Sequence, residues 1–74
     1  MDEFQRSIDL CKSAVLEAFP ALNAEQLEYF WNGGLMEITR MLFRAKGTTD
    51  MYLVTRDELA GTFSVVKYVA ESNA

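Results

Sequence analysis

Histidine is absent from this chain of 74 residues, and cysteine, proline and tryptophan each occur once. Without histidine the common catalytic triads and proton transfer by imidazole are excluded, and no carboxylate cluster has the spacing of metal ligands. The single cysteine, Cys11, cannot form an internal disulfide, and its place in an apolar helical stripe predicts a small buried residue. We therefore expect no enzymatic activity, no metal and no cofactor.

Long apolar runs are also missing from the sequence. No stretch approaches the roughly 18 apolar residues that a membrane span requires, and the N-terminus carries no charged and apolar leader. A single cysteine is consistent with a reducing compartment. We therefore expect a cytoplasmic protein that makes no membrane contact.

Positive charge is scarce, because seven basic residues stand against eleven acidic ones and leave a formal net charge of −4. The excess lies in residues 1–29, which carry six acids and two bases, whereas residues 30–74 carry five of each. An acidic surface repels the phosphate backbone of nucleic acids and attracts basic partners, although a modest net charge also serves solubility. We do not expect nucleic acid as a partner.

Apolar side chains are abundant, since half of the residues are hydrophobic and nine are aromatic. We expect one domain over residues 1–74, and a domain of this size buries only about 60% of the surface that its unfolded chain exposes. So small a domain cannot easily hide this many apolar side chains from water. The composition therefore favours self-association, and we expect a homodimer.

Apolar spacing predicts a first helix over residues 2–19. Apolar residues recur every three or four positions between Phe4 and Phe19, and charged residues fall on the opposite side. Pro20 should end this helix, because it has no N–H to donate and displaces the preceding residue from the helical region.

A second helix is predicted over residues 23–46. Asn23 is its expected N-cap, and Gly47 suits the position after its last turn. Gly33 and Gly34 interrupt this segment, and each glycine costs about 1 kcal/mol in a helix interior. We expect a helix that is continuous or kinked at this point rather than broken into two.

A second apolar stripe runs along this predicted helix. Tyr29, Met36 and Phe43 are seven residues apart, on the side opposite the main apolar face, with Arg40 at the edge. Such a stripe suits either a helix sandwiched within the subunit or a helix that packs on a partner. We expect Tyr29, Met36, Phe43 and Arg40 at or near a partner or dimer interface, with burial inside the subunit as the alternative.

The last part of the chain predicts a β-hairpin with strands at about 50–56 and 62–69. Residues 62–69 are mostly β-branched or aromatic, and Gly61 can supply a positive φ in the connecting loop. The expected fold is α+β, with two packed helices followed by this hairpin. The alternative is an all-α fold with a C-terminal helix-turn-helix, because residues 55–65 resemble the first helix and turn of such a unit.

Two classes of function remain after these exclusions. The features favour a small acidic protein-binding module of bacterial or phage origin, which acts by protein–protein interaction as an inhibitor or adaptor. Many inhibitors that phages and other mobile elements carry share these features, but this association identifies no target. The alternative is a compact helix-turn-helix transcriptional regulator in which Arg56 and Lys67 contact DNA.

Overall fold

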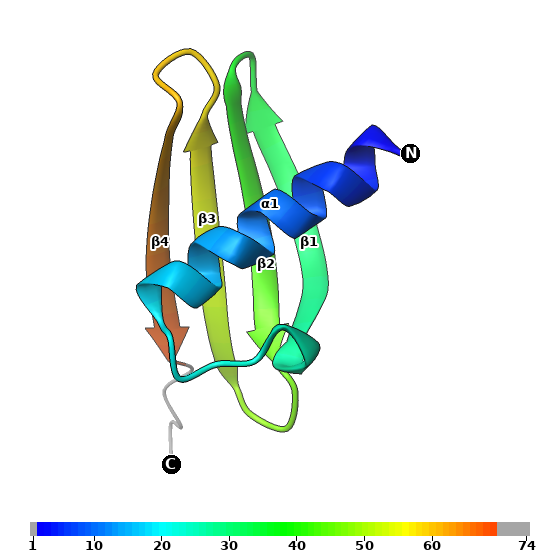
Figure 1. Ribbon diagram of the computed structural model, residues 1–74, viewed down its shortest axis with the longest axis vertical. Helices are drawn as coiled ribbons and strands as arrows, with labels where there is room; N and C mark the ends of the chain where they lie inside the picture. The colour runs from blue at the N-terminus through cyan, green and yellow to red at the C-terminus, as the bar shows by residue number, and fades with distance from the viewer. Residues whose placement is uncertain (1, 70–74) are drawn as a thin grey trace.

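One helix precedes a four-stranded antiparallel sheet in the computed structural model, which describes residues 2–69 (Figure 1). The helix, α1, spans Glu3–Ala18, and one turn of 3-10 helix, η1, spans Ala24–Gln26. The strands lie side by side in sequence order, and they are β1 (Leu27–Leu35), β2 (Ile38–Ala45), β3 (Asp50–Asp57) and β4 (Thr62–Val69).

Helix α1 confirms the first predicted helix to within one residue at each end. Asp2 caps it, because its carboxylate accepts a hydrogen bond of 3.1 Å from the backbone N–H of Phe4. The helix ends just before the single proline of the chain. Its apolar stripe lies against the sheet and buries Ile8, Cys11 and Val15.

The predicted second helix over residues 23–46 is wrong. The cap signal at Asn23 is real, since its backbone N–H donates to the side chain of Gln26 at 2.9 Å, but only the turn η1 follows before Leu27 begins β1. Strands β1 and β2 then replace the helix. Both faces of β2 carry apolar residues. Some of these residues fall at a helical spacing by chance, although the side chains of the segment in fact alternate between the two faces of a sheet.

The two adjacent glycines belong to the end of a hairpin and not to a helix kink. Gly34 has a φ of 137°, and a Cβ at this position would lie 2.1 Å from the carbonyl oxygen of Ile38. No residue with a side chain fits there without moving the backbone. Met36 follows in the turn between β1 and β2 with a φ of 57°, which is unusual for a residue other than glycine.

The predicted hairpin is present as β3 and β4, which pair from Asp50 with Val69 to Asp57 with Thr62. The predicted fold class is nevertheless wrong, because this hairpin is half of a four-stranded sheet and only one long helix precedes it. The all-α alternative is wrong as well. Residues 55–65 belong to β3, the following turn and β4, where strong β propensity prevails over the helical pattern.

The core lies between α1 and one face of the sheet. Figure 1 shows the helix running diagonally across that face, from β1 at its N-terminal end to β4 at its C-terminal end. The buried residues form a single cluster between the two layers: Ile8, Cys11, Val15, Leu27, Met41, Phe43, Ala45, Tyr52 and Val54. One face of the sheet is therefore occupied by the subunit's own helix.

Candidate protein-binding surface

The other face of the sheet carries no helix among residues 2–69. Side chains alternate between the two faces along a strand, so the neighbours of the buried Met41, Phe43 and Val54 point away from α1. We call this surface the open face. It has four rows of cross-strand neighbours, which are Glu28–Arg44–Met51–Tyr68, Trp31–Leu42–Leu53–Val66, Gly33–Arg40–Thr55–Ser64 and Leu35–Ile38–Asp57–Thr62.

The second of these rows is apolar across the whole width of the sheet. Trp31 pairs with Leu42, Leu42 with Leu53, and Leu53 with Val66. Residues directly opposite each other on adjacent strands have Cβ atoms about 5 Å apart, so these four side chains form one continuous line. We call this line the central row.

Trp31 belongs to the central row because of a β-bulge in β1. The register of β1 against β2 shifts between Tyr29 and Trp31, which leaves Phe30 as an extra residue. Tyr29 pairs with Phe43 on the helix side, and without the bulge Trp31 would also point toward the helix. A Cβ at Gly33 would lie 2.6 Å from the indole ring, so this glycine leaves the space in which the indole lies.

The open face exposes large apolar side chains. Water reaches 48% of Trp31, 44% of Val66, 52% of Tyr68 and 77% of Leu35. Half-exposed aromatic side chains such as those of Trp31 and Tyr68 leave about 100 Å² each, and with Leu35 and Val66 the four residues present roughly 400 Å² of mostly apolar surface. A patch of this size matches the largest apolar patches of typical monomers, which are often functional.

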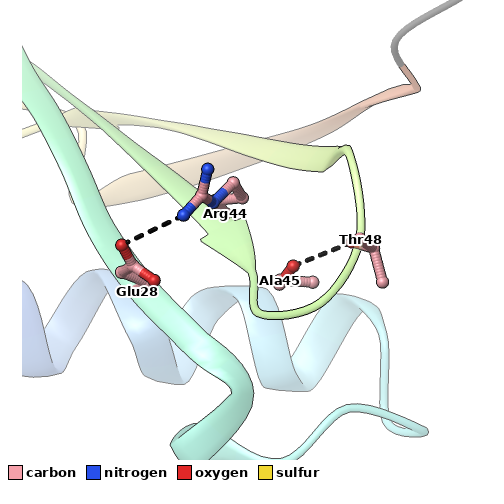
Figure 2. A network of polar contacts seen from close by, with 4 residues as sticks. All are labelled: Glu28, Arg44, Ala45 and Thr48. Carbon is pink, nitrogen blue, oxygen red and sulfur yellow. Dashed lines mark hydrogen bonds and ion pairs between the residues drawn. The ribbon is translucent and has the colours of Figure 1, made fainter.

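The charges of the open face are few and are of both signs. Glu28 and Arg44 lie on adjacent strands and form an ion pair with 3.3 Å between Oε1 and Nη2 (Figure 2). Figure 2 also shows the next turn, in which the Thr48 hydroxyl donates to the carbonyl oxygen of Ala45 at 2.8 Å. Arg40 is exposed at the other side of the central row. Its guanidinium borders a hollow of about 500 Å³ lined by Trp31, Gly34, Leu35, Ile38 and Arg40.

The residues that the sequence predicts as an interface do not share one surface. Phe43 is fully buried in the core, with 0% exposure. Tyr29 lies on the helix side, where its ring centroid is 5.5 Å from that of Phe4. Met36 is 88% exposed in the turn between β1 and β2, and only Arg40 lies on the open face. The heptad spacing carries no meaning here, because it presupposed a helix.

The predicted DNA contacts, Arg56 and Lys67, lie on neighbouring strands rather than on a recognition helix. The guanidinium carbon of Arg56 is 5.8 Å from the ring centroid of Phe63. The ammonium of Lys67 is 3.7 Å from the carboxylate of Asp50 and 6.0 Å from the ring centroid of Tyr52. Both cations are thus engaged by other side chains of the subunit, and the helix-turn-helix on which the DNA hypothesis depended is absent from this segment.

Sequence reasoning missed the central row, although a signal for it exists. If residues 38–45 form a strand, every second side chain points to the same face, so Met41 and Phe43 lie on one face and Leu42 on the other. This reading predicts a strand with apolar residues on both faces, as expected when both faces are covered. The bulge at Phe30 has no comparable signal, so Trp31 could not have been assigned to the open face from the sequence.

Other kinds of site find little support in the geometry. Residues 2–69 contain no group of three or more histidine, cysteine, aspartate or glutamate side chains placed to hold a metal ion. Burial raises the pKa of the Cys11 thiol above its ordinary value of 9.0, and the nearby charge of Arg56 partly opposes this effect. Helical segments in the same range lack the combined length and apolar character needed to cross a bilayer.

No protein-family model matches this chain. Comparisons with curated proteins and with solved structures also return no match. Any functional conclusion therefore depends on the surface of the molecule itself, and the open face is its most distinctive feature.

Proposed function

We propose that this protein is a small protein-binding module, an inhibitor or adaptor, and that it works as a homodimer in which the open faces of two sheets pack together. The observation that carries the proposal is the central row, which crosses all four strands without a break. A sheet that is apolar on both faces needs a second layer on each of them. Helix α1 supplies one layer, and a second copy supplies the other.

The size of the open face is sufficient for a reversible dimer. Four strands about 4.8 Å apart, each with eight residues or more at about 3.3 Å, make a face of roughly 500 Å². Two such faces bury about 1,000 Å² in total, which is near the lower limit for a specific interface. We therefore expect a dissociation constant in the micromolar range rather than an obligate dimer.

The arrangement of large and small residues selects one two-fold axis. An axis that runs along the strands places β1 over β4 of the second copy, so Trp31 lies on the smaller Val66 and Leu42 lies on Leu53. The central row is complementary to itself in this orientation. The two sheets then align within about 30° of each other, as in ordinary β-sandwiches.

Charge supports the same axis. With the axis along the strands, Arg44 meets Met51 of the second copy and Arg40 meets Thr55. An axis along the central row would instead place Arg44 on Arg40 of the second copy, and like charges would then meet in a desolvated interface. The open face is thus complementary to itself in one orientation and not in the other.

Trp31 provides the experiment, because it is the single tryptophan of the chain and lies on the open face. Its emission should shift to shorter wavelength, and its quenching by iodide should fall, as the protein concentration rises through the micromolar range. Sedimentation equilibrium should show monomer and dimer over the same range. A protein that stays monomeric, with an unchanged emission spectrum at the highest concentration, would contradict the proposal.

A further inference from the structure

The outer edge of β4 belongs to the more regular of the two edge strands. β4 is the last strand in the order, and within residues 2–69 no strand pairs with its outer side. Its pairing with β3 is regular over all eight residues, whereas β1 at the opposite edge contains a bulge and two glycines. Bulges and charges are common devices against edge-to-edge pairing, and β4 has one charge, Lys67.

A groove runs beside this edge on the helix side. It has a volume of about 550 Å³ and lies between the C-terminal half of α1 and the start of β4. Figure 1 shows that the diagonal helix reaches β4 only at its C-terminal end. Apolar side chains dominate the lining, with Leu10 and Ala14 on the helix opposite Phe63 and Val65 on the strand.

The groove also has a defined charge. Glu17 lines it, together with the hydroxyl-bearing Ser13, and no basic residue lies in its wall. Lys67 further along β4 is 3.7 Å from Asp50 and is therefore already paired. A ligand that brings an apolar side chain and a cation on one side of its backbone would match this lining.

We propose that β4 and the adjacent groove form a second protein-binding site, which takes an extended basic and apolar segment of a partner as a fifth strand of the sheet. Backbone N–H and C=O groups on the edge of β4 supply the hydrogen bonds of strand addition. Alternate side chains of the segment enter the groove, and a lysine or arginine approaches Glu17. The site is independent of the open face, because the proposed dimer leaves the edges of both sheets uncovered.

A second copy of this chain is a poorer occupant of the same edge. Its β4 has one basic residue, Lys67, which already pairs with Asp50. A second β4 therefore brings no unpaired cation to Glu17. The charge of the groove therefore favours a basic partner over self-pairing.

The test uses a fluorescent peptide in which valine and threonine alternate around a central lysine, so that the valines and the lysine share one side. Binding is measured by fluorescence anisotropy against the whole protein. Saturable binding is expected, and alternate N-methylation of the peptide backbone should abolish it because the strand hydrogen bonds are lost. Replacing the lysine of the peptide by glutamate should weaken binding by about fivefold or more.

Two pairs of protein variants separate the site from general charge and stability effects. Glu17→Lys should weaken peptide binding by about fivefold, whereas Glu25→Lys, with the same change in net charge outside the groove, should leave it unchanged. Ser13→Trp fills the groove from an exposed helix position and should weaken binding at least about tenfold. Gln5→Trp, on an exposed part of α1 outside the groove, should have no such effect.

Each other outcome overturns the proposal. Equal loss of peptide binding in Glu17→Lys and Glu25→Lys would show that binding depends on the net charge of the protein and not on the groove. Binding that survives both N-methylation and Ser13→Trp would exclude strand addition at β4. If Ser13→Trp abolishes dimerisation in sedimentation while the peptide does not bind, the edge serves a second copy instead. Variants of the open face should bind the peptide like the unmodified protein, so the two proposals can fail separately.

Discussion

Replacing Leu53 by threonine should separate the dimer into folded monomers. Leu53 lies at the middle of the central row and is partly buried by its neighbours within one subunit, so packing against a second copy removes the remaining exposed part of its side chain from water. Burial of that part, about 40 Å², is worth about 1 kcal/mol, and the two-fold axis counts it twice. Each threonine hydroxyl buried without a partner adds about 1 kcal/mol more. The total of about 4 kcal/mol raises the dissociation constant by about a thousandfold.

Sedimentation equilibrium gives the dissociation constant, and urea unfolding at low concentration gives the stability of the monomer. Threonine retains the β propensity of the strand, so the free energy of unfolding of the monomer should fall by only about 1 kcal/mol. Leu59→Thr is the matched control, because Leu59 is exposed in the turn after β3 and outside the open face. The reasoning is refuted if Leu53→Thr dimerises as well as the unmodified protein, or if Leu59→Thr weakens dimerisation equally.

Further changes test the core, the first hairpin and the buried thiol. Phe43→Ala should lower the free energy of unfolding by about 3–5 kcal/mol, because Phe43 is fully buried. The variant should therefore unfold instead of yielding a folded monomer, and far-ultraviolet circular dichroism distinguishes these results. Met36→Gly should raise the free energy of unfolding in urea by up to about 1 kcal/mol, since Met36 is highly exposed with a φ of 57°; a decrease would contradict this assignment. Gly34→Ala should destabilise the protein by several times that amount, because its Cβ would meet the backbone of Ile38; unchanged stability would refute this. Burial raises the pKa of the Cys11 thiol, so the folded state holds this proton more tightly than the unfolded state. That stabilisation is complete below the ordinary value of 9.0 and is lost as the pH rises through the raised pKa. Urea unfolding at alkaline pH should therefore show a loss of stability that Cys11→Ala lacks.

Strong local signals were reliable over much of the chain. Between Phe4 and Phe19, apolar residues recur at a helical period with charged residues on the opposite side, and Pro20 ends this pattern. Helix α1 could therefore be predicted closely. Residues 62–69 have a β-branched and aromatic composition that no helix favours, so β4 could be predicted as well. Neither segment depends on its partners for its type.

Local signals did not predict the secondary structure of the segment from Leu27 to Ala45. Its apolar residues fall at helical and at alternating spacings together, and the cap at Asn23 begins a helical turn that stops at once. A strand at this point gains its stability from pairing with other strands and from contact with α1. These contacts join residues that are far apart in the sequence, so a local pattern does not reveal them. The stripe of Tyr29, Met36 and Phe43 was built on a helix over this segment, and the structure has strands there instead.

The sequence by itself determined the helix, the hairpin of β3 and β4, and a large supply of apolar side chains for a chain this small. Only the tertiary structure decided where these side chains lie. The bulge at Phe30 shifts β1 by one residue against β2, and because side chains alternate with a period of two, this shift turns Trp31 from the helix side to the open face. Pairing of the strands then aligns it with Leu42, Leu53 and Val66, which are far apart in sequence. Register is a property of paired strands, and no single strand specifies it.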